Sequence, residues 1–432
     1  MVVSDRIRRV LSSLALVLCV VLAAGTADAR KADQEQQDAK KFGISRPVAE
    51  KLLEAYDLLE AERFDEALKV VDDLAKRRKL QPPETAQIHR FRAYIYVNKG
   101  LSEKATGEFE KSLALNAMEP EAEQVMMYSL AQIYTELGRY DEALALINRW
   151  FGAVESPKAD AYFLKAMILV QQKNFEDAAE PSAKALELSK TPKESWLTLD
   201  GVIQTQLKNY AKVEKTLEQL VELAPAKAQY WTQLAAVQQH LEHEEKALAT
   251  MQLAYKAGLL KGEKELRQLA SLLFIRQQPY ECAQVIQRGL TDGVVRESAD
   301  AYRLIANCLI SAREVDKALE PLAKAGELST DGSMYLLLGQ LHLQRDRFEQ
   351  AIEALEKGLE KVAPAQRGSA HLLLGIALLG NEQFAEAQQA FQVAADDAKV
   401  GRAAESYLKF LETKQVAQQQ PEAGSAGGAT GG

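Results

Sequence analysis

FDEA, at residues 64–67, is an aromatic residue followed by two polar residues and alanine, and this pattern returns throughout the chain. Clear copies are YDEA at 140–143, FEDA at 175–178, YECA at 280–283, FEQA at 348–351 and FAEA at 384–387. Weaker copies end at Ala105, Val213, Ala247 and Ala318 and fill the gaps between the clear ones. The ten last positions, called anchors below, are about 36 residues apart on average. Self-similarity at such a period predicts an array of repeated units.

A small residue stands twelve positions before every anchor. The ten residues are Ala55, Ala93, Ala131, Ala166, Gly201, Ala235, Ser271, Ala306, Gly339 and Gly375. Two packed helices need a small side chain where their axes cross closely. Large apolar residues stand four positions after most anchors, one helical turn on, with Ser182 and Gln287 as exceptions. Each unit is therefore predicted to be a helix, a turn and a second helix.

The pattern resembles the tetratricopeptide repeat (TPR), whose period is about 34 residues. Leu130-Ala131, Leu234-Ala235, Leu338-Gly339 and Leu374-Gly375 stand in its Leu-Gly positions, and Pro225 stands at its loop position. The resemblance implies an all-α fold, a right-handed superhelical solenoid of about ten helix-turn-helix repeats plus a C-terminal capping helix. Such an array presents an extended surface built mainly by the first helix of each repeat.

The resemblance divides the chain into segments. The TPR array is expected at 47–401, and a capping helix at 402–415 would cover its open apolar end. The charged, Gln-rich linker at 30–46 and the low-complexity tail at 416–432 are expected to be disordered.

The N-terminus resembles a secretory signal peptide. Arg6, Arg8 and Arg9 precede an apolar run at 10–24, and Ala27-Asp28-Ala29 forms an A-x-A site, so we expect cleavage after Ala29. The alternative is an uncleaved anchor, but fifteen apolar residues are fewer than the ~20 that cross a bilayer. A signal peptide at 1–29 predicts a periplasmic protein without stable membrane insertion after cleavage.

Composition argues against several classes of function. The chain has 432 residues, with 53 Lys and Arg spread along it against 61 Asp and Glu, for a net charge of −8. A nucleic-acid partner is not expected, because such binding depends on a concentrated basic surface. The chain has no G-x-S-x-G, Walker or H-E-x-x-H motif, and the array leaves no room for a catalytic domain. We therefore expect neither an enzyme nor a cofactor.

Two pairs of residues could carry metal or thiol chemistry. His240 and His243 lie three residues apart without a convincing third ligand, so a solvated turn is favoured over a metal site. Cys282 and Cys308 occupy repeat positions that face different ways in the alignment above, so two free thiols are favoured over a disulfide.

The first helices of the first four repeats would line a groove with aromatic and aliphatic groups. We expect this groove, centred on Tyr94, Tyr128 and Phe163, to hold an extended or helical segment of a protein partner. The predicted partner-binding residues are Tyr56, Arg90, Tyr94, Tyr128, Gln132, Phe163 and Met167. The alternative is that a small error in register makes them ordinary core residues between repeats.

A second, narrower resemblance rests on segments within and after the array. They are PKESWL at 192–197, YWTQLA at 230–235, KALATMQLAY at 246–255 and RAAESYL at 402–408. They resemble the periplasmic TPR proteins encoded beside TonB, ExbB and ExbD in Gram-negative bacteria. This resemblance implies a non-catalytic scaffold or adaptor in a TonB-type energy-transduction system, with TonB, ExbB/ExbD or a TonB-dependent transporter as partner. The alternative is an envelope scaffold for outer-membrane, secretion-system or cell-wall assembly.

Overall fold

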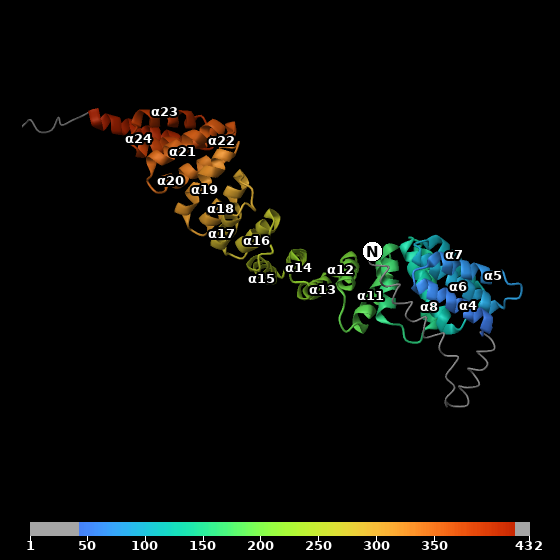
Figure 1. The fold of residues 1–432 in the computed structure, drawn as a ribbon. Coiled ribbons are helices and arrows are strands. Elements are labelled where there is room, and N and C mark those ends of the chain that lie inside the picture. Colours follow the sequence, from blue (N-terminus) through green and yellow to red (C-terminus); the bar gives the residue numbers. More distant parts are fainter. Residues whose placement is uncertain (1–42, 420–432) are drawn as a thin grey trace, which may run out of the picture. The chain divides into compact units, whose positions relative to one another are not determined.

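The computed structural model describes residues 43–419, and this part of the chain contains 21 α-helices and no strand. Ten consecutive helix pairs, repeats 1 to 10, are followed by a single last helix (Figure 1). The first helices are α4 (Arg46–Glu60), α6 (Pro82–Asn98), α8 (Pro120–Glu136), α10 (Ala159–Gln171), α12 (Glu194–Gln206), α14 (Ala228–His240), α16 (Glu263–Ile275), α18 (Ala299–Ser311), α20 (Ser333–Leu343) and α22 (Pro364–Gly380). The second helices are α5 (Phe64–Ala75), α7 (Ser102–Ala114), α9 (Tyr140–Ala153), α11 (Phe175–Leu188), α13 (Tyr210–Leu223), α15 (Glu244–Lys256), α17 (Pro279–Thr291), α19 (Val315–Leu328), α21 (Phe348–Lys361) and α23 (Phe384–Ala395). The predicted all-α repeat fold is confirmed.

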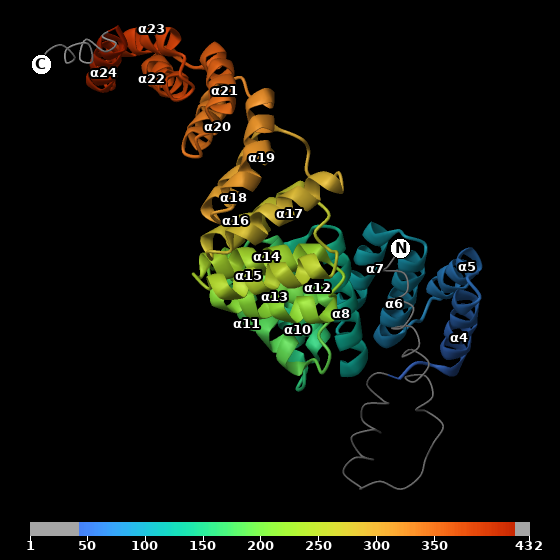
Figure 2. The ribbon, with the colours of Figure 1, turned by 90° about the vertical axis from the view of Figure 1, so that its left-hand side faces the viewer.

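The chain divides into two compact units, Met1–Thr216 (unit 1) and Leu217–Gly432 (unit 2), with the boundary inside α13. Within each unit the helices follow one another as antiparallel pairs, seen from two sides in Figures 1 and 2. In both units a first helix packs on the second helix of its own pair and on the second helix of the preceding pair, as α10 does on α11 and α9. A continuous core inside each unit results from this stacking.

The small residues do lie where the two helices of a repeat cross. All six alanines of the series are fully buried, and so are the anchors Ala67 and Ala351. A Cβ added to Gly339 would lie 2.5 Å from Leu355 Cγ, and one added to Gly375 would lie 2.6 Å from Phe391 Cδ1. Leu355 and Phe391 each stand four residues after an anchor. The crossing predicted from the sequence is therefore confirmed.

The turn between the two helices has one backbone conformation in all ten repeats. A residue five positions before the anchor, or six before Ala283 in repeat 7, has a positive φ, between 53° and 74°. These residues are Glu62, Gly100, Gly138, Lys173, Lys208, Glu242, Gln277, Arg313, Asp346 and Glu382. The next residue donates its N–H to a carbonyl five residues back, as Arg63 does to Leu58 at 2.8 Å. This is a Schellman ending, in which a left-handed residue closes the helix.

In repeat 7 the structure places the anchor one residue earlier than the sequence pattern predicted. Its left-handed residue is Gln277 and α17 begins at Pro279, so the anchor position is held by Cys282 and not by Ala283. The small crossing residue is then the fully buried Ala270, whereas Ser271 is exposed. Four residues after the corrected anchor stands Ile286, which is fully buried, so the Gln287 exception disappears.

The ends of the array differ in part from the expectation. The last helix, α24, spans Gly401–Gln419 and so continues past the predicted cap into the tail expected to be disordered from 416. Alanine and glutamine at 417–419 favour helix there. The Tyr407 ring of α24 stacks on Phe391 at 4.9 Å. At the other end Ser45, assigned to the linker, donates its N–H to Glu84 Oε1 at 3.0 Å. The signal peptide, the linker up to residue 42 and the tail beyond 419 lie outside the described residues.

Candidate functional site

The predicted groove residues fall into two groups. Tyr56 of α4, Tyr128 and Gln132 of α8, and Phe163 and Met167 of α10 are half-buried, so part of each side chain remains accessible. Arg90 and Tyr94 of α6 are each only 3 % exposed. For these two residues the prediction of an open groove lining is wrong, and the core alternative is correct.

Packing explains why Tyr94 and Arg90 are buried. The Tyr94 ring meets Phe109 of α7 edge-on, with 5.2 Å between centroids, and Tyr94 belongs to the main core of unit 1. The Arg90 guanidinium lies 5.7 Å from the Tyr94 ring centroid and donates to Gln87 Oε1 at 3.2 Å. Both the Arg90 Nε–H and the Tyr94 hydroxyl are buried without a hydrogen-bond partner. Both polar groups are thus held by packing more than by hydrogen bonds.

An aromatic row links α8, α9 and α10 on the half-buried side of unit 1. Tyr128 meets Trp150 at 5.4 Å, Trp150 meets Phe151 at 5.3 Å, and Phe151 meets Tyr162 at 4.9 Å. Tilted and edge-to-face ring contacts of this kind add to the stabilisation that comes from burying apolar surface. Sequence reasoning missed this row because it considered only the first helices, whereas Trp150 and Phe151 come from a second helix.

Phe163 makes a separate ring contact. It stacks on Trp196 of α12, with 5.1 Å between centroids and 15° between the planes. The Lys193 ammonium lies 4.7 Å from the centroid of the same indole. One face of the Phe163 ring is therefore used within the fold, and only its remaining surface is available to a partner.

A buried ion network joins repeats 1 and 2. Glu108 of α7, 7 % exposed, lies 2.7 Å from His89 Nδ1, 3.0 Å from Arg92 Nη1 and 2.7 Å from Lys111 Nζ. Arg92 also reaches Asp72 of α5 at 2.8 Å. Burial by itself raises the pKa of Glu108, but the hydrogen bonds from Lys111, His89 and Arg92 outweigh it and lower the pKa to about 2. The network ties three helices together with a carboxylate that stays charged.

A buried polar cluster occupies repeats 4 and 5 of unit 1. Asp200 of α12 accepts hydrogen bonds from Ser182 Oγ at 3.2 Å, Thr216 Oγ1 at 3.0 Å and Gln204 Nε2 at 3.3 Å. Ser182 was an exception among the apolar residues that follow the anchors. The Asp200 carboxylate explains that exception, because a buried acceptor requires donors.

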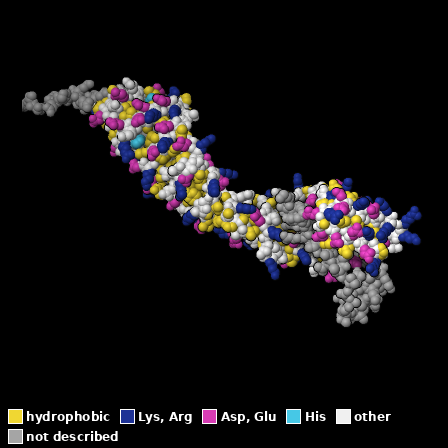
Figure 3. Space-filling view, in the orientation of Figure 1, with side chains coloured by type: hydrophobic (Ala, Val, Ile, Leu, Met, Phe, Trp, Pro, Cys, Tyr) yellow, Lys and Arg dark blue, Asp and Glu magenta, His cyan; other side chains and the backbone are white. Residues whose placement is uncertain are grey.

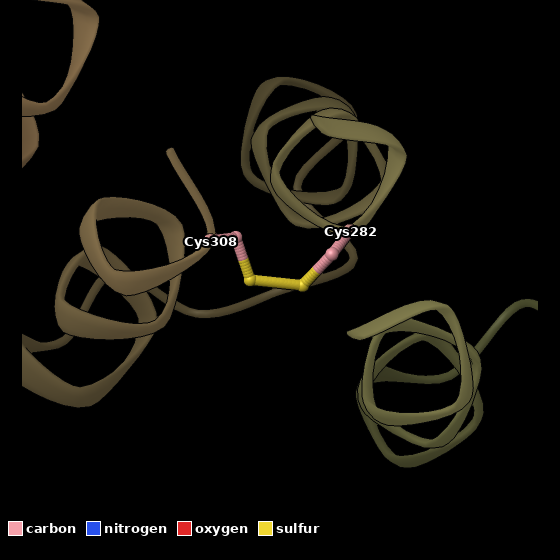
Figure 4. The surroundings of a disulfide bond; sticks show 2 residues. All are labelled: Cys282 and Cys308. Atoms are coloured by element: carbon pink, nitrogen blue, oxygen red, sulfur yellow. A yellow bond between two sulfur atoms is a disulfide. The ribbon is translucent and has the colours of Figure 1, made fainter. Parts of the chain in front are cut away.

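Cys282 and Cys308 form a disulfide bond, so the prediction of two free thiols is wrong (Figure 4). Their Cα atoms are 6.0 Å apart, a normal separation for the bond. The cause of the error is the one-residue shift in repeat 7, which puts Cys282 at the inward-facing anchor position. The bond joins α17 to α18, the facing helices of repeats 7 and 8.

Two further features bear on function. In residues 43–419 no group of three or more His, Cys, Asp and Glu side chains is placed to hold a metal ion, and His240 and His243 are exposed. No helix in the same range is long and apolar enough to cross a membrane.

Comparison with known proteins identifies the repeat. The tetratricopeptide-repeat family model matches residues 52–120, 128–193 and 336–412. The chain is a tetratricopeptide-repeat protein. No curated protein is detectably similar in sequence over this chain. Tetratricopeptide repeats typically act as non-catalytic scaffolds for protein–protein interaction.

Several solved TPR structures are similar to this chain, all at low identity. A TPR protein from Parabacteroides merdae is 14% identical, with 77% of this chain and 100% of that chain covered and a TM-score of 0.37. The C-terminal part of a TPR protein from Cytophaga hutchinsonii is 16% identical, with 64% and 95% covered and a TM-score of 0.37. YrrB, described as a TPR protein with an unusual peptide-binding site, is 17% identical, with 42% and 89% covered and a TM-score of 0.35.

Charged side chains of both signs are interspersed on the face of the TPR array drawn in Figure 3, and Lys and Arg do not gather there into one patch. Close ion pairs along single helices, such as Lys184 with Glu187 at 3.0 Å, contribute to this mixing. A surface of mixed charge fits a protein partner better than a polyanion.

Proposed function

We propose that this TPR protein is an exported, non-catalytic adaptor that binds a protein partner on the first helices of repeats 1 to 4. The observation that carries the proposal is the half-buried set Tyr56, Tyr128, Gln132, Phe163 and Met167, which combines apolar area with one amide. Partly exposed aromatic and Met side chains are typical of protein-recognition surfaces.

The periplasm is the compartment that we propose. The Cys282–Cys308 disulfide supports it, because structural disulfides persist in oxidising compartments and are rare in the cytosol. The basic residues, apolar run and A-x-A site at residues 6–29 support it independently. Edman sequencing of the protein from a periplasmic extract should begin at Arg30. A mature protein found in the cytosol with both thiols reduced would contradict this part of the proposal.

The partner that we propose is TonB, ExbB/ExbD or a TonB-dependent transporter, on the strength of the resemblance described above. The test places a photo-crosslinking amino acid, p-benzoylphenylalanine, at Gln132 in living cells and identifies the crosslinked proteins by mass spectrometry. Asn148, exposed on α9 of the same repeat, is the matched control position.

We expect Gln132 to capture a member of the TonB system and Asn148 to capture none. If Gln132 captures secretion or cell-wall proteins, the TonB assignment is wrong although the binding face is correct. Equal capture at both positions would contradict the proposed face itself.

A further inference from the structure

Repeats 4 and 8 are similar to each other in sequence, 140 residues apart. Their first helices begin ADAY, at 159–162 and 299–302, and their second helices end in EPSAKALEL at 180–188 and EPLAKAGEL at 320–328. Repeat 4 lies in unit 1 and repeat 8 in unit 2. The two repeats therefore allow a direct comparison of the same local structure in two places.

Both repeats carry a buried proline as the seventh residue of the second helix, Pro181 in α11 and Pro321 in α19. Proline has no N–H, so the carbonyl four residues earlier receives no helical hydrogen bond from it. Each repeat also has a tyrosine in its first helix, Tyr162 or Tyr302, and a lysine three residues after the proline in its second helix, Lys184 or Lys324.

The two repeats differ in what lies against the tyrosine. In repeat 4 the Phe151 ring, twelfth residue of α9, packs on Tyr162 at 4.9 Å, and the Lys165 ammonium lies 5.3 Å from the Phe151 ring centroid. The twelfth residue of α17, at the corresponding place before repeat 8, is Leu290. Leucine has no ring, and the structure leaves an open cavity there.

The cavity has a volume of about 320 Å³ and lies between α17, α18 and α19. Its apolar walls are Leu290, Tyr302, Ile305 and Pro321, of which Tyr302 and Ile305 are 8 % and 1 % exposed. Polar side chains complete the lining: Gln287, Thr291, Lys317, Glu320 and Lys324. The Lys324 ammonium lies 5.4 Å from the Tyr302 ring centroid. Lys324 pairs with Glu320 at 3.2 Å and Lys317 pairs with Glu314 at 3.1 Å, so neither lysine leaves an uncompensated charge at the mouth.

We propose that this cavity is a second binding site, which receives the aromatic ring of a phenylalanine side chain from a partner protein. The occupant is inferred from repeat 4, where the chain itself places a phenylalanine ring against the equivalent tyrosine. Tyr302 offers the incoming ring an aromatic wall, as Tyr162 does for Phe151, and Ile305 stands where repeat 4 has Lys165. The balanced charge at the mouth favours an uncharged ring over a carboxylate. The site goes beyond the proposed function, because it lies in unit 2 and does not depend on the groove of unit 1.

The test uses the full mature chain with ¹³C-labelled isoleucine methyl groups and N-acetyl-L-phenylalaninamide as the probe. We expect the probe to shift the NMR signal of the Ile305 methyl group, with Ile147 of unit 1 as the unaffected reference. N-acetyl-L-leucinamide is the matched control probe and should bind more weakly. An equal shift of Ile305 by both probes would contradict a site for rings.

Two reciprocal substitutions complete the test. Leu290→Phe fills the cavity as Phe151 does in repeat 4, so it should weaken probe binding about tenfold or more. Phe151→Leu opens the equivalent place in repeat 4, so the methyl signal of Ile147, one helical turn before residue 151, should shift with the probe in this variant. A gain of binding cannot arise from misfolding, so this variant decides the question if Leu290→Phe folds poorly. Unchanged binding to Leu290→Phe, or no new shifts in Phe151→Leu, would overturn the proposal.

Discussion

Units 1 and 2 use the same helix pairs and the same turns, and ion pairs join neighbouring repeats in both, but unit 2 adds a covalent bond. In unit 1, charges and rings make the connection, through Arg92 and Asp72 between repeats 1 and 2 and through Phe151 and Tyr162 between repeats 3 and 4. In unit 2, Arg345 pairs with Asp316 between repeats 8 and 9, and a disulfide joins repeats 7 and 8. The difference teaches that the pattern of small crossing residues and left-handed turns sets the fold, whereas the contacts between repeats are free to vary.

The largest effect is expected from breaking the covalent joint of unit 2. The bond closes a loop between residues 26 apart, and a cross-link of that length stabilises by about 3 kcal/mol. Reduction with dithiothreitol should therefore lower the stability of α17 and α18, measured by hydrogen exchange with mass spectrometry, and leave α6 and α7 unchanged. The Cys282→Ala/Cys308→Ala double variant is the control and should not respond to the reductant. Equal loss of protection in both units would contradict the expectation that reduction destabilises unit 2 alone.

The next effect comes from the helix crossings. Gly339→Ala in unit 2 places a methyl group 2.5 Å from Leu355 Cγ, and overpacking of this kind costs about 1–3 kcal/mol. In repeat 4 of unit 1 the same position holds Ala166, which is completely buried. The loss of stability is measured by chemical denaturation, with amide hydrogen exchange in α20 and α21 as the readout. A neutral Gly339→Ala variant would mean that the two helices of repeat 9 can move apart freely.

Acid should affect the ion network of unit 1 through Glu108. Its pKa is lowered to about 2, so the folded state binds this proton less readily than the unfolded chain does. The stability that it contributes is present above the unfolded pKa of about 4.3 and is lost as pH falls towards 2. Glu108→Gln should remove this dependence and destabilise repeats 1 and 2 by about 2 kcal/mol at neutral pH. An unchanged acid profile of α6 and α7 in this variant would show that other carboxylates dominate.

Unit 2 should respond to acid at higher pH through His342. Burial, with the nearby Arg347 and Arg345, lowers the pKa of this histidine below 6.5. The unfolded chain therefore binds the proton first, and the contribution to stability declines as pH falls below 6.5. We expect hydrogen exchange in α20 to accelerate between pH 7 and pH 5, after correction for the intrinsic rate, and His342→Leu to abolish that change. The same acceleration in His342→Leu would assign it to another group.

The helix pairs, which every repeat shares, could be predicted from the sequence, whereas contacts that occur in a single repeat could not. The ten small residues and ten anchors identify the helix pairs, because each repeat supplies the same local requirement. Tyr94 and Cys282 were placed wrongly for physical reasons. The burial of Tyr94 depends on Phe109 in another helix, and Cys282 is displaced by one residue in a pattern that tolerates Ala at either position. Contacts such as Arg92 with Asp72 join side chains whose pairing no periodic pattern records.

The smallest effect concerns the turns, where the two units again differ. Among the turns within a repeat, unit 1 has glycine at the left-handed position in two, as at Gly138, and unit 2 has a non-glycine residue there in all of its turns. A Cβ on Gly138 would meet nothing within 4 Å, so Gly138→Ala tests the backbone alone. We expect this variant to lose about 1 kcal/mol of stability, because the left-handed conformation is costly for residues with a Cβ.

Lys173→Gly makes the opposite change, at φ 61° in repeat 4. Its stability should stay within about 0.5 kcal/mol of the wild type, because glycine relieves the strain in the turn but also gains freedom in the unfolded chain. Urea denaturation of both variants measures the difference, and a Gly138→Ala variant as stable as the wild type would show that the turn, and not the residue in it, carries the conformation.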